Sequence, residues 1–106
     1  MDRRVSPRAR LGEQTLWLNK HIGGFPHMAE LLEVSDGGML IRTIREPSNR
    51  ETTFTLELEI PGSHHRMWLW AELVRSEGNV QALRIVHADL LERAQLRQLV
   101  RWRAAA

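Results

Sequence analysis

Alternation of apolar and polar residues is the strongest pattern along this chain. Over residues 53–60, Thr and Glu alternate with four apolar side chains, Phe54, Leu56, Leu58 and Ile60. This period of two is typical of a strand with one buried and one wet face. Comparable runs, separated by segments rich in Gly, Pro, Ser and Asn, predict further strands over residues 14–20, 28–34, 38–43, 66–75 and 80–87. The pattern therefore predicts six short strands.

The period changes after Asp89. Apolar residues then gather on one half of a helical wheel: Leu91, Leu96, Leu99, Val100 and Trp102. Asp89 suits the N-cap position, with Glu92 three residues on as in a capping box, and arginines crowd the C-terminal end, where the helix dipole favours them. A helix over residues 89–103 is predicted. We expect it to cover one open end of a small antiparallel β-barrel.

Trp68 and Trp70 share one side of the strand predicted over residues 66–75. Packing in the core or at the barrel end, beneath the helix, is the expectation for them. The alternative is an exposed aromatic patch that binds a partner protein or stacks on bases.

Composition limits the classes of function. The 106 residues suffice for one domain, residues 1–106, and a 42% apolar content suffices for a compact core. Cysteine is absent, which excludes disulfides and thiolate metal sites. No apolar run approaches the ~20 residues of a membrane span, so we expect a soluble, cytoplasmic protein without membrane insertion. A net charge of +2 argues against bulk binding of DNA or RNA.

Charge is unevenly distributed, because four arginines and one aspartate stand in the first ten residues. Residues 1–12 lack periodicity and contain Pro7 and Gly12, which predicts a flexible arm. An arm that a ligand orders would suit an anion clamp, and a solvated basic tail is the alternative. At the end of the second predicted strand, residues 33–38 combine a carboxylate, a hydroxyl and a glycine turn with backbone N–H donors.

These two segments together resemble the signature motifs of the PilZ domain family, RxxxR followed by [D/N]xSxxG. The chain reads Arg4-x-x-x-Arg8 and Glu33-x-Ser35-x-x-Gly38, with Glu33 where the family has Asp or Asn. The similarity covers nearly the whole chain. It implies a mainly β fold, a six-stranded antiparallel PilZ-type β-barrel over residues 14–87 with a C-terminal α-helix and a flexible N-terminal arm.

The resemblance also implies a receptor for cyclic di-GMP, a bacterial second messenger bound by domains of this family. It assigns six residues to the ligand: Arg3, Arg4, Arg8, Glu33, Ser35 and Gly38. The guanidiniums would bind phosphates and guanine edges, while the carboxylate would accept from guanine N1–H and N2–H₂. Among similar domains, a basic residue at the place of Arg3 accompanies two intercalated ligands per domain. Ligand would order the arm and change the binding of an unidentified partner protein.

Glu33 leaves an alternative open. Its extra methylene would displace the acceptor by roughly an ångström, a shift that can weaken a site considerably. The chain would then be a PilZ-like domain that does not bind the nucleotide and acts as a protein-interaction adaptor in pilus or flagellar control. A third hypothesis is a small barrel that binds single-stranded RNA or DNA through Trp68, Trp70 and arginines, and the near-neutral charge disfavours it.

No catalytic or metal-binding pattern is found in the sequence. The five histidines lack ligand spacing and are expected on the surface or in turns. Ser35 does not lie in a GxSxG elbow. Glu57 and Glu59 are expected on an ordinary solvated strand face. We expect neither enzymatic activity nor a cofactor.

Overall fold

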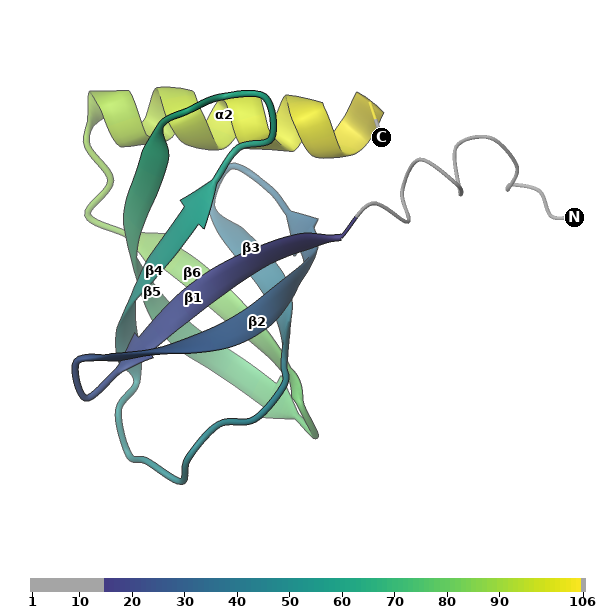
Figure 1. Ribbon diagram of the computed structural model, residues 1–106. Coiled ribbons are helices and arrows are strands. Elements are labelled where there is room, and N and C mark those ends of the chain that lie inside the picture. The colour runs from purple at the N-terminus through teal and green to yellow at the C-terminus, as the bar shows by residue number, and fades with distance from the viewer. Residues whose placement is uncertain (1–14, 106) are drawn as a thin grey trace, which may run out of the picture.

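The computed structural model describes residues 15–105. Six antiparallel strands close into one barrel in the order β1-β2-β3-β6-β5-β4, and a single described helix lies across one end of it (Figure 1). The elements are β1 (Leu16–Ile22), β2 (Phe25–Val34), β3 (Gly38–Thr43), β4 (Thr53–Glu59), β5 (Arg66–Glu77), β6 (Val80–Val86) and α2 (Leu90–Ala105). The mainly β barrel with its C-terminal helix is confirmed. The arm predicted for residues 1–12 lies outside the described residues.

The core lies inside the barrel and consists of the apolar residues that the alternation selects. On β4, Phe54, Leu56 and Leu58 are buried, and on β5 the same holds for Met67 and Leu69. Every second residue of a barrel strand points inward, so a period of two in the sequence fills the interior.

The first hairpin is tighter than predicted. The ladder between β1 and β2 continues through the pairs His21↔Pro26 and Ile22↔Phe25, so both strands extend beyond the ranges 14–20 and 28–34 that the sequence predicted. Only Gly23 and Gly24 form the turn, at φ of 60° and 84°. Two consecutive residues with positive φ give the turn whose twist matches that of the flanking strands, and glycine adopts it at low cost.

Helix α2 begins with the predicted capping box. The Glu92 backbone N–H donates to Asp89 Oδ1 at 2.8 Å, and the Asp89 N–H donates to Glu92 Oε1 at 2.9 Å. Leu96 and Leu99 are buried in the core and close this end of the barrel. Leu91, predicted to be on the buried face, is 68% exposed. It lies about 110° around the helix from the middle of that pair, at 100° per residue.

No helix among residues 15–105 is long and apolar enough to cross a membrane.

A buried ion pair occupies the interior toward the β3–β4 loop, which lies at the end opposite α2 in Figure 1. Lys20 is 1% exposed, and its Nζ donates to both Glu46 oxygens at 3.1 Å and to Gln81 Oε1 at 2.7 Å. The same ammonium lies 3.8 Å from the centroid of the Phe54 ring. Burial lowers the pKa of the Lys20 ammonium from its ordinary value, against the opposing effect of Glu46.

We predict that Glu46→Gln destabilises the protein by about 2–4 kcal/mol at pH 7, because a buried charge loses its counter-charge. The folded-state pKa of Lys20 lies below its ordinary 10.5, so stability rises with pH in the window below 10.5. In the variant Lys20 has lost the effect of Glu46 that raises its pKa, so stability rises more steeply with pH. The difference in unfolding free energy between the variant and the unmodified protein should therefore narrow as pH increases from 7 toward 10. Urea denaturation at several pH values measures this, with Glu77→Gln as an exposed control. A difference in unfolding free energy that does not change with pH would contradict the role given to Lys20.

Candidate functional site

A β-bulge turns Glu33 to the outside of the barrel. Leu31 pairs with Ile41 and Glu33 with Leu40, so Leu32 is one extra residue in β2. Residues two apart on a regular strand face the same side, and Leu31 is fully buried. The extra residue breaks that alternation, and Glu33 is exposed while Val34 packs against the core. The bulge thus brings the first motif residue to the surface.

The end of α2 holds this bulge. The Arg103 guanidinium donates to the Leu32 carbonyl at 3.2 Å and, at 3.4 Å, to the Leu31 carbonyl. A bulge disrupts the strand ladder locally, so these carbonyls need other donors. The helix therefore contributes to the placement of Glu33 as well as to the core.

The motif turn closes through backbone hydrogen bonds. The Ser35 N–H donates to the Gly38 carbonyl at 2.9 Å, and the Ile85 N–H donates to the Gly37 carbonyl at 2.8 Å. The Ser35 N–H is therefore engaged within the turn. The Ser35 hydroxyl is held weakly, at 3.4 Å from the Gly38 carbonyl, and can rotate toward a ligand.

Gly38 is required by close packing. A Cβ at this position would lie 2.6 Å from the Leu83 carbonyl oxygen of β6. Gly37 has nothing within 4 Å of its equivalent position. The glycine of the motif therefore lets β3 and β6 approach each other where the turn meets the barrel.

Three of the six predicted ligand residues line one hollow, of about 250 Å³. Its lining comes from the end of β2, the motif turn, β3 and β6: Glu33, Val34, Ser35, Gly38, Met39, Leu40, Ala82 and Leu83. Glu33 is the only charged residue among them. The described lining therefore offers a carboxylate and a hydroxyl but no cation, and an anionic ligand would need cations from elsewhere.

The other predicted residues, Arg3, Arg4 and Arg8, lie outside the described residues. The chain enters the barrel next to the hollow, because Leu16 pairs with Leu31 beside the bulge. Seven residues lie between Arg8 and Leu16, and the eight steps from one Cα to the other span at most about 29 Å of extended chain. Chain length alone thus allows Arg8 to reach the hollow.

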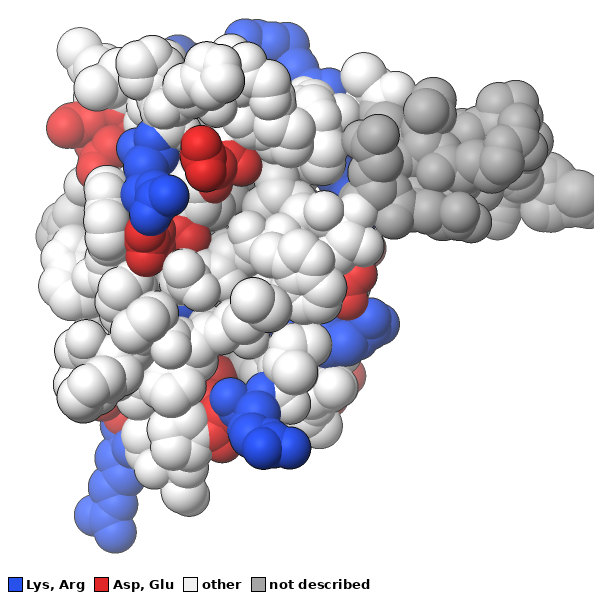
Figure 2. All heavy atoms as spheres, viewed as in Figure 1, with Lys and Arg blue, Asp and Glu red and all other residues white. Residues whose placement is uncertain are grey.

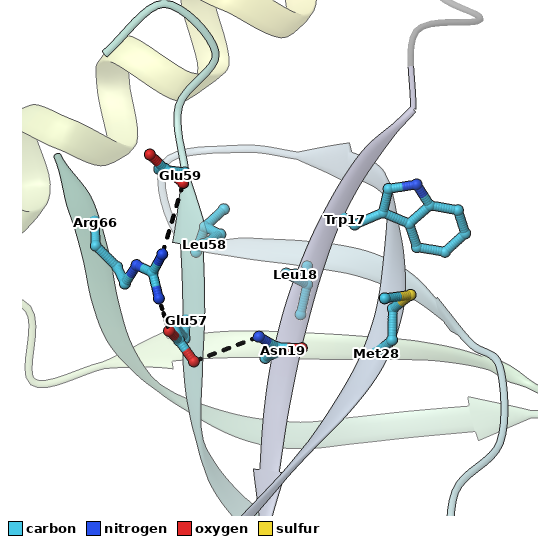
Figure 3. A pocket seen from close by; sticks show the side chains of 8 residues that line it. All are labelled: Trp17, Leu18, Asn19, Met28, Glu57, Leu58, Glu59 and Arg66. Atoms are coloured by element: carbon cyan, nitrogen blue, oxygen red, sulfur yellow. Dashed lines mark hydrogen bonds and ion pairs between the residues drawn. The ribbon is translucent and has the colours of Figure 1, made fainter. Parts of the chain in front are cut away.

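A second polar cluster, which the sequence did not reveal, surrounds Glu57 on the outer surface of β1, β4 and β5. The Glu57 carboxylate accepts a hydrogen bond from His21 Nε2 at 2.9 Å. It also accepts one from Asn19 at 3.4 Å and forms an ion pair with Arg66 (Figure 3). His21 foremost, then Arg66 and Asn19, lower the pKa of Glu57, against the opposing effect of burial.

The expectation of a solvated Glu57 is therefore wrong, since only 9% of it is exposed, while Glu59 is exposed as expected. The expectation for the tryptophans is also wrong, because Trp68 and Trp70 are 46% and 48% exposed. Both residues face outward on β5, away from the buried Met67 and Leu69. Residues 15–105 contain no group of three His, Asp or Glu side chains that could hold a metal ion.

Comparison with known proteins gives the family. The chain matches the PilZ domain model over residues 2–102. It therefore belongs to the PilZ domain family, as its motifs indicated. No curated protein matches the sequence.

Solved structures show the same fold. The PilZ domain of YcgR from Escherichia coli, with c-di-GMP, superposes with a TM-score of 0.66 at 14% identity over 81% of this chain and 79% of that one. The PilZ domain of CeSA from a cellulose-synthesizing bacterium gives 0.64 at 14% identity, over 82% and 90%. An uncharacterised Legionella protein gives 0.50 at 19% identity, over 79% and 82%.

The two glycines of the motif turn allow a matched test. We predict that Gly38→Ala costs about 1–3 kcal/mol of unfolding free energy, because the new methyl meets a backbone carbonyl that cannot move cheaply. Gly37→Ala has open space and should change stability by less than about 0.5 kcal/mol. Thermal denaturation of both variants measures the difference. Equal stabilities would show that the close approach of β3 to β6 does not require glycine.

Proposed function

We propose that this chain is a receptor domain for cyclic di-GMP in the bacterial cytoplasm. Family membership supports this, and so does the presence of c-di-GMP in the E. coli structure that shares the fold. The observation that carries most weight is where the motif residues lie in the fold. Glu33, Ser35 and Gly38, matched to the family motif, line the same hollow because a bulge and a turn bring them there.

Each residue has a role that its chemistry suits. The Glu33 carboxylate accepts from the N1–H and N2–H₂ of guanine, and the Ser35 hydroxyl contacts guanine or phosphate. Gly38, which has no side chain, allows β3 to approach the Leu83 carbonyl of β6 beside the hollow. Arg3, Arg4 and Arg8 supply the cations that the described lining lacks and bind the two phosphates with charge-assisted hydrogen bonds.

Two or three such arginine contacts, together with the contact of Ser35 and guanidinium stacking on guanine, can reach micromolar affinity. A hydrogen bond to a charged group contributes about 1.5–3 kcal/mol, and a micromolar dissociation constant corresponds to about 8 kcal/mol. The output is a change of binding partner rather than chemistry on the ligand. Nucleotide orders the arm against the barrel, and a partner protein that binds one state better than the other reads the change.

Glu33 favours a second candidate, a PilZ domain that acts as a protein-interaction adaptor and has lost nucleotide binding. The longer side chain places the acceptor roughly an ångström further out than Asp or Asn would. Calorimetry with cyclic di-GMP separates the two candidates.

We predict that isothermal titration calorimetry detects micromolar or tighter binding of cyclic di-GMP. Arg4→Ala or Arg8→Ala should abolish it without changing the melting temperature of the empty protein, since these substitutions remove ligand contacts only. Arg97→Ala, an exposed arginine on α2, is the matched control and should bind normally. Absence of heat for the unmodified protein would support the adaptor. Normal affinity in both arm variants would show that the arm is not the clamp.

Stoichiometry tests Arg3 separately. We expect two nucleotides per domain, and a value near one would remove the intercalated pair while leaving the receptor proposal intact.

Glu33→Asp should tighten binding, because it restores the length that the family motif has at this position. Glu33→Ala should weaken binding by about tenfold or more, the equivalent of one lost charge-assisted hydrogen bond. Equal affinities in all three forms would show that this carboxylate does not contact the nucleotide. Both affinities come from the same calorimetric titration.

A further inference from the structure

Three of the four tryptophans project from one side of the barrel. Trp17, Trp68 and Trp70 are 47%, 46% and 48% exposed, and Met28 is 54% exposed. The strand register places Met28 and Trp68 in one row, separated by Asn19 and Glu57, and Trp17 and Trp70 lie two residues along β1 and β5 from that row. Met28 pairs with Asn19, Asn19 with Glu57 and Glu57 with Trp68, in one row across β2, β1, β4 and β5. We call this surface, defined by Trp17, Met28, Trp68 and Trp70, the aromatic face.

The aromatic face has the composition of an interface. Trp, Met and Arg are enriched where proteins bind one another. In Figure 2, side chains without charge cover most of the middle of the side that carries β1 and β2, with charged groups around them. The barrel is closed, so this surface offers side chains rather than a free strand edge.

The cluster around Glu57 holds the side chains at the centre of the aromatic face in place. Its carboxylate binds Asn19, His21 and Arg66 from neighbouring strands, and the His21 ring packs against Trp68 with 5.5 Å between centroids. Figure 3 shows Trp17 and Met28 on one side of Asn19 and the charged Glu57, Glu59 and Arg66 on the other side. Side chains held in place before binding lose less entropy when a partner arrives.

The charges around the indoles favour a positively charged group on the partner. A hollow of about 510 Å³ lies against Trp68, Trp70 and Glu51, and a smaller one of about 160 Å³ lies against Trp17, Glu57 and Glu59. These linings contain three carboxylates and one guanidinium, Arg66, which is already paired with Glu57 and Glu59. Indole faces are themselves negative and attract cations.

We propose that the aromatic face docks a partner protein through an arginine-bearing segment. A guanidinium stacks on an indole and also forms paired hydrogen bonds with a carboxylate, and arginine does both better than lysine. The arginine side chains lie over Trp68 and Trp70 beside Glu51, and over Trp17 beside Glu59.

The position of the face leaves the nucleotide site accessible. In the closed order β1-β2-β3-β6-β5-β4, the seam between β1 and β4 is directly across the ring from the seam between β3 and β6. Glu57 belongs to the first seam, and Gly38 with Ala82 belongs to the second. The centre of the aromatic face therefore lies across the ring from the hollow, and docking there does not require the nucleotide site, so the inference applies to a receptor and to an adaptor alike.

The four indole N–H signals in ¹H–¹⁵N spectra of the full chain provide the test. The probe is the peptide acetyl-Arg-Gly-Arg-Gly-Arg-amide, added to millimolar concentration, and the control peptide has Gln in place of each Arg. Trp17, Trp68 and Trp70 should shift saturably with the arginine peptide only. Trp102, packed against the core, should not move and serves as an internal reference.

Two variants sharpen the test. Trp70→Ala and Glu51→Gln should each weaken peptide binding by about fivefold, in the range of one cation–π or exposed ionic contact. Leu91→Ala, an exposed apolar residue on α2, should leave binding unchanged. Equal shifts with the glutamine peptide, movement of Trp102 to the same extent, or no shift at millimolar peptide would each overturn the proposal. So would indole broadening that grows with protein concentration and disappears in Trp70→Ala, because a second copy would then be the occupant.

Discussion

Closure of six strands into one ring is the constraint on which the rest of the structure depends. A closed ring has no unpaired edge, so every strand is fixed by two neighbours. Closure requires β3 and β6 to approach where the motif turn enters the barrel, and a glycine at position 38 is what permits it. The same ring separates the two surface features, because the β3–β6 seam and the β1–β4 seam lie on opposite sides.

The two ends of the barrel are closed by different chemistry. At one end, Leu96 and Leu99 of α2 extend the apolar core, and Arg103 binds the carbonyls of the bulge. At the other end, a lysine, a glutamate and a glutamine satisfy one another inside the barrel. The apolar end is coupled to the motif through the bulge, so the helix supports the site even though it supplies none of its lining.

Period and spacing predicted the features that depend on neighbours in sequence. The alternation located the six strands, and Asp89 with Glu92 located the helix start, because both patterns reflect local backbone geometry. Glu33, Ser35 and Gly38 were found through the family motif, and they line one hollow. The arginines of that motif lie outside the described residues, so their part in the site remains a proposal.

Features that depend on distant partners were missed. Lys20 follows Leu16 and Leu18 at the inward period, which was a usable signal, but Glu46 and Gln81 are its partners only in three dimensions. Glu57 has the same outward alternation as Glu59, and only cross-strand neighbours distinguish the buried carboxylate from the exposed one. Alternation does not show which outward part of a barrel a helix covers. For this reason Trp68 and Trp70 were wrongly expected in the core or beneath the helix.

The central claim is that the hollow at the end of β2 binds cyclic di-GMP, and residue-resolved spectroscopy tests it most directly. Titration of the ¹⁵N-labelled chain with the nucleotide should shift the backbone amides of Ser35, Gly38 and Ala82 saturably. The amides of Asn19 and Glu57, across the ring, should stay in place. Spectra that do not change at saturating nucleotide, or shifts confined to the opposite seam, would contradict the account.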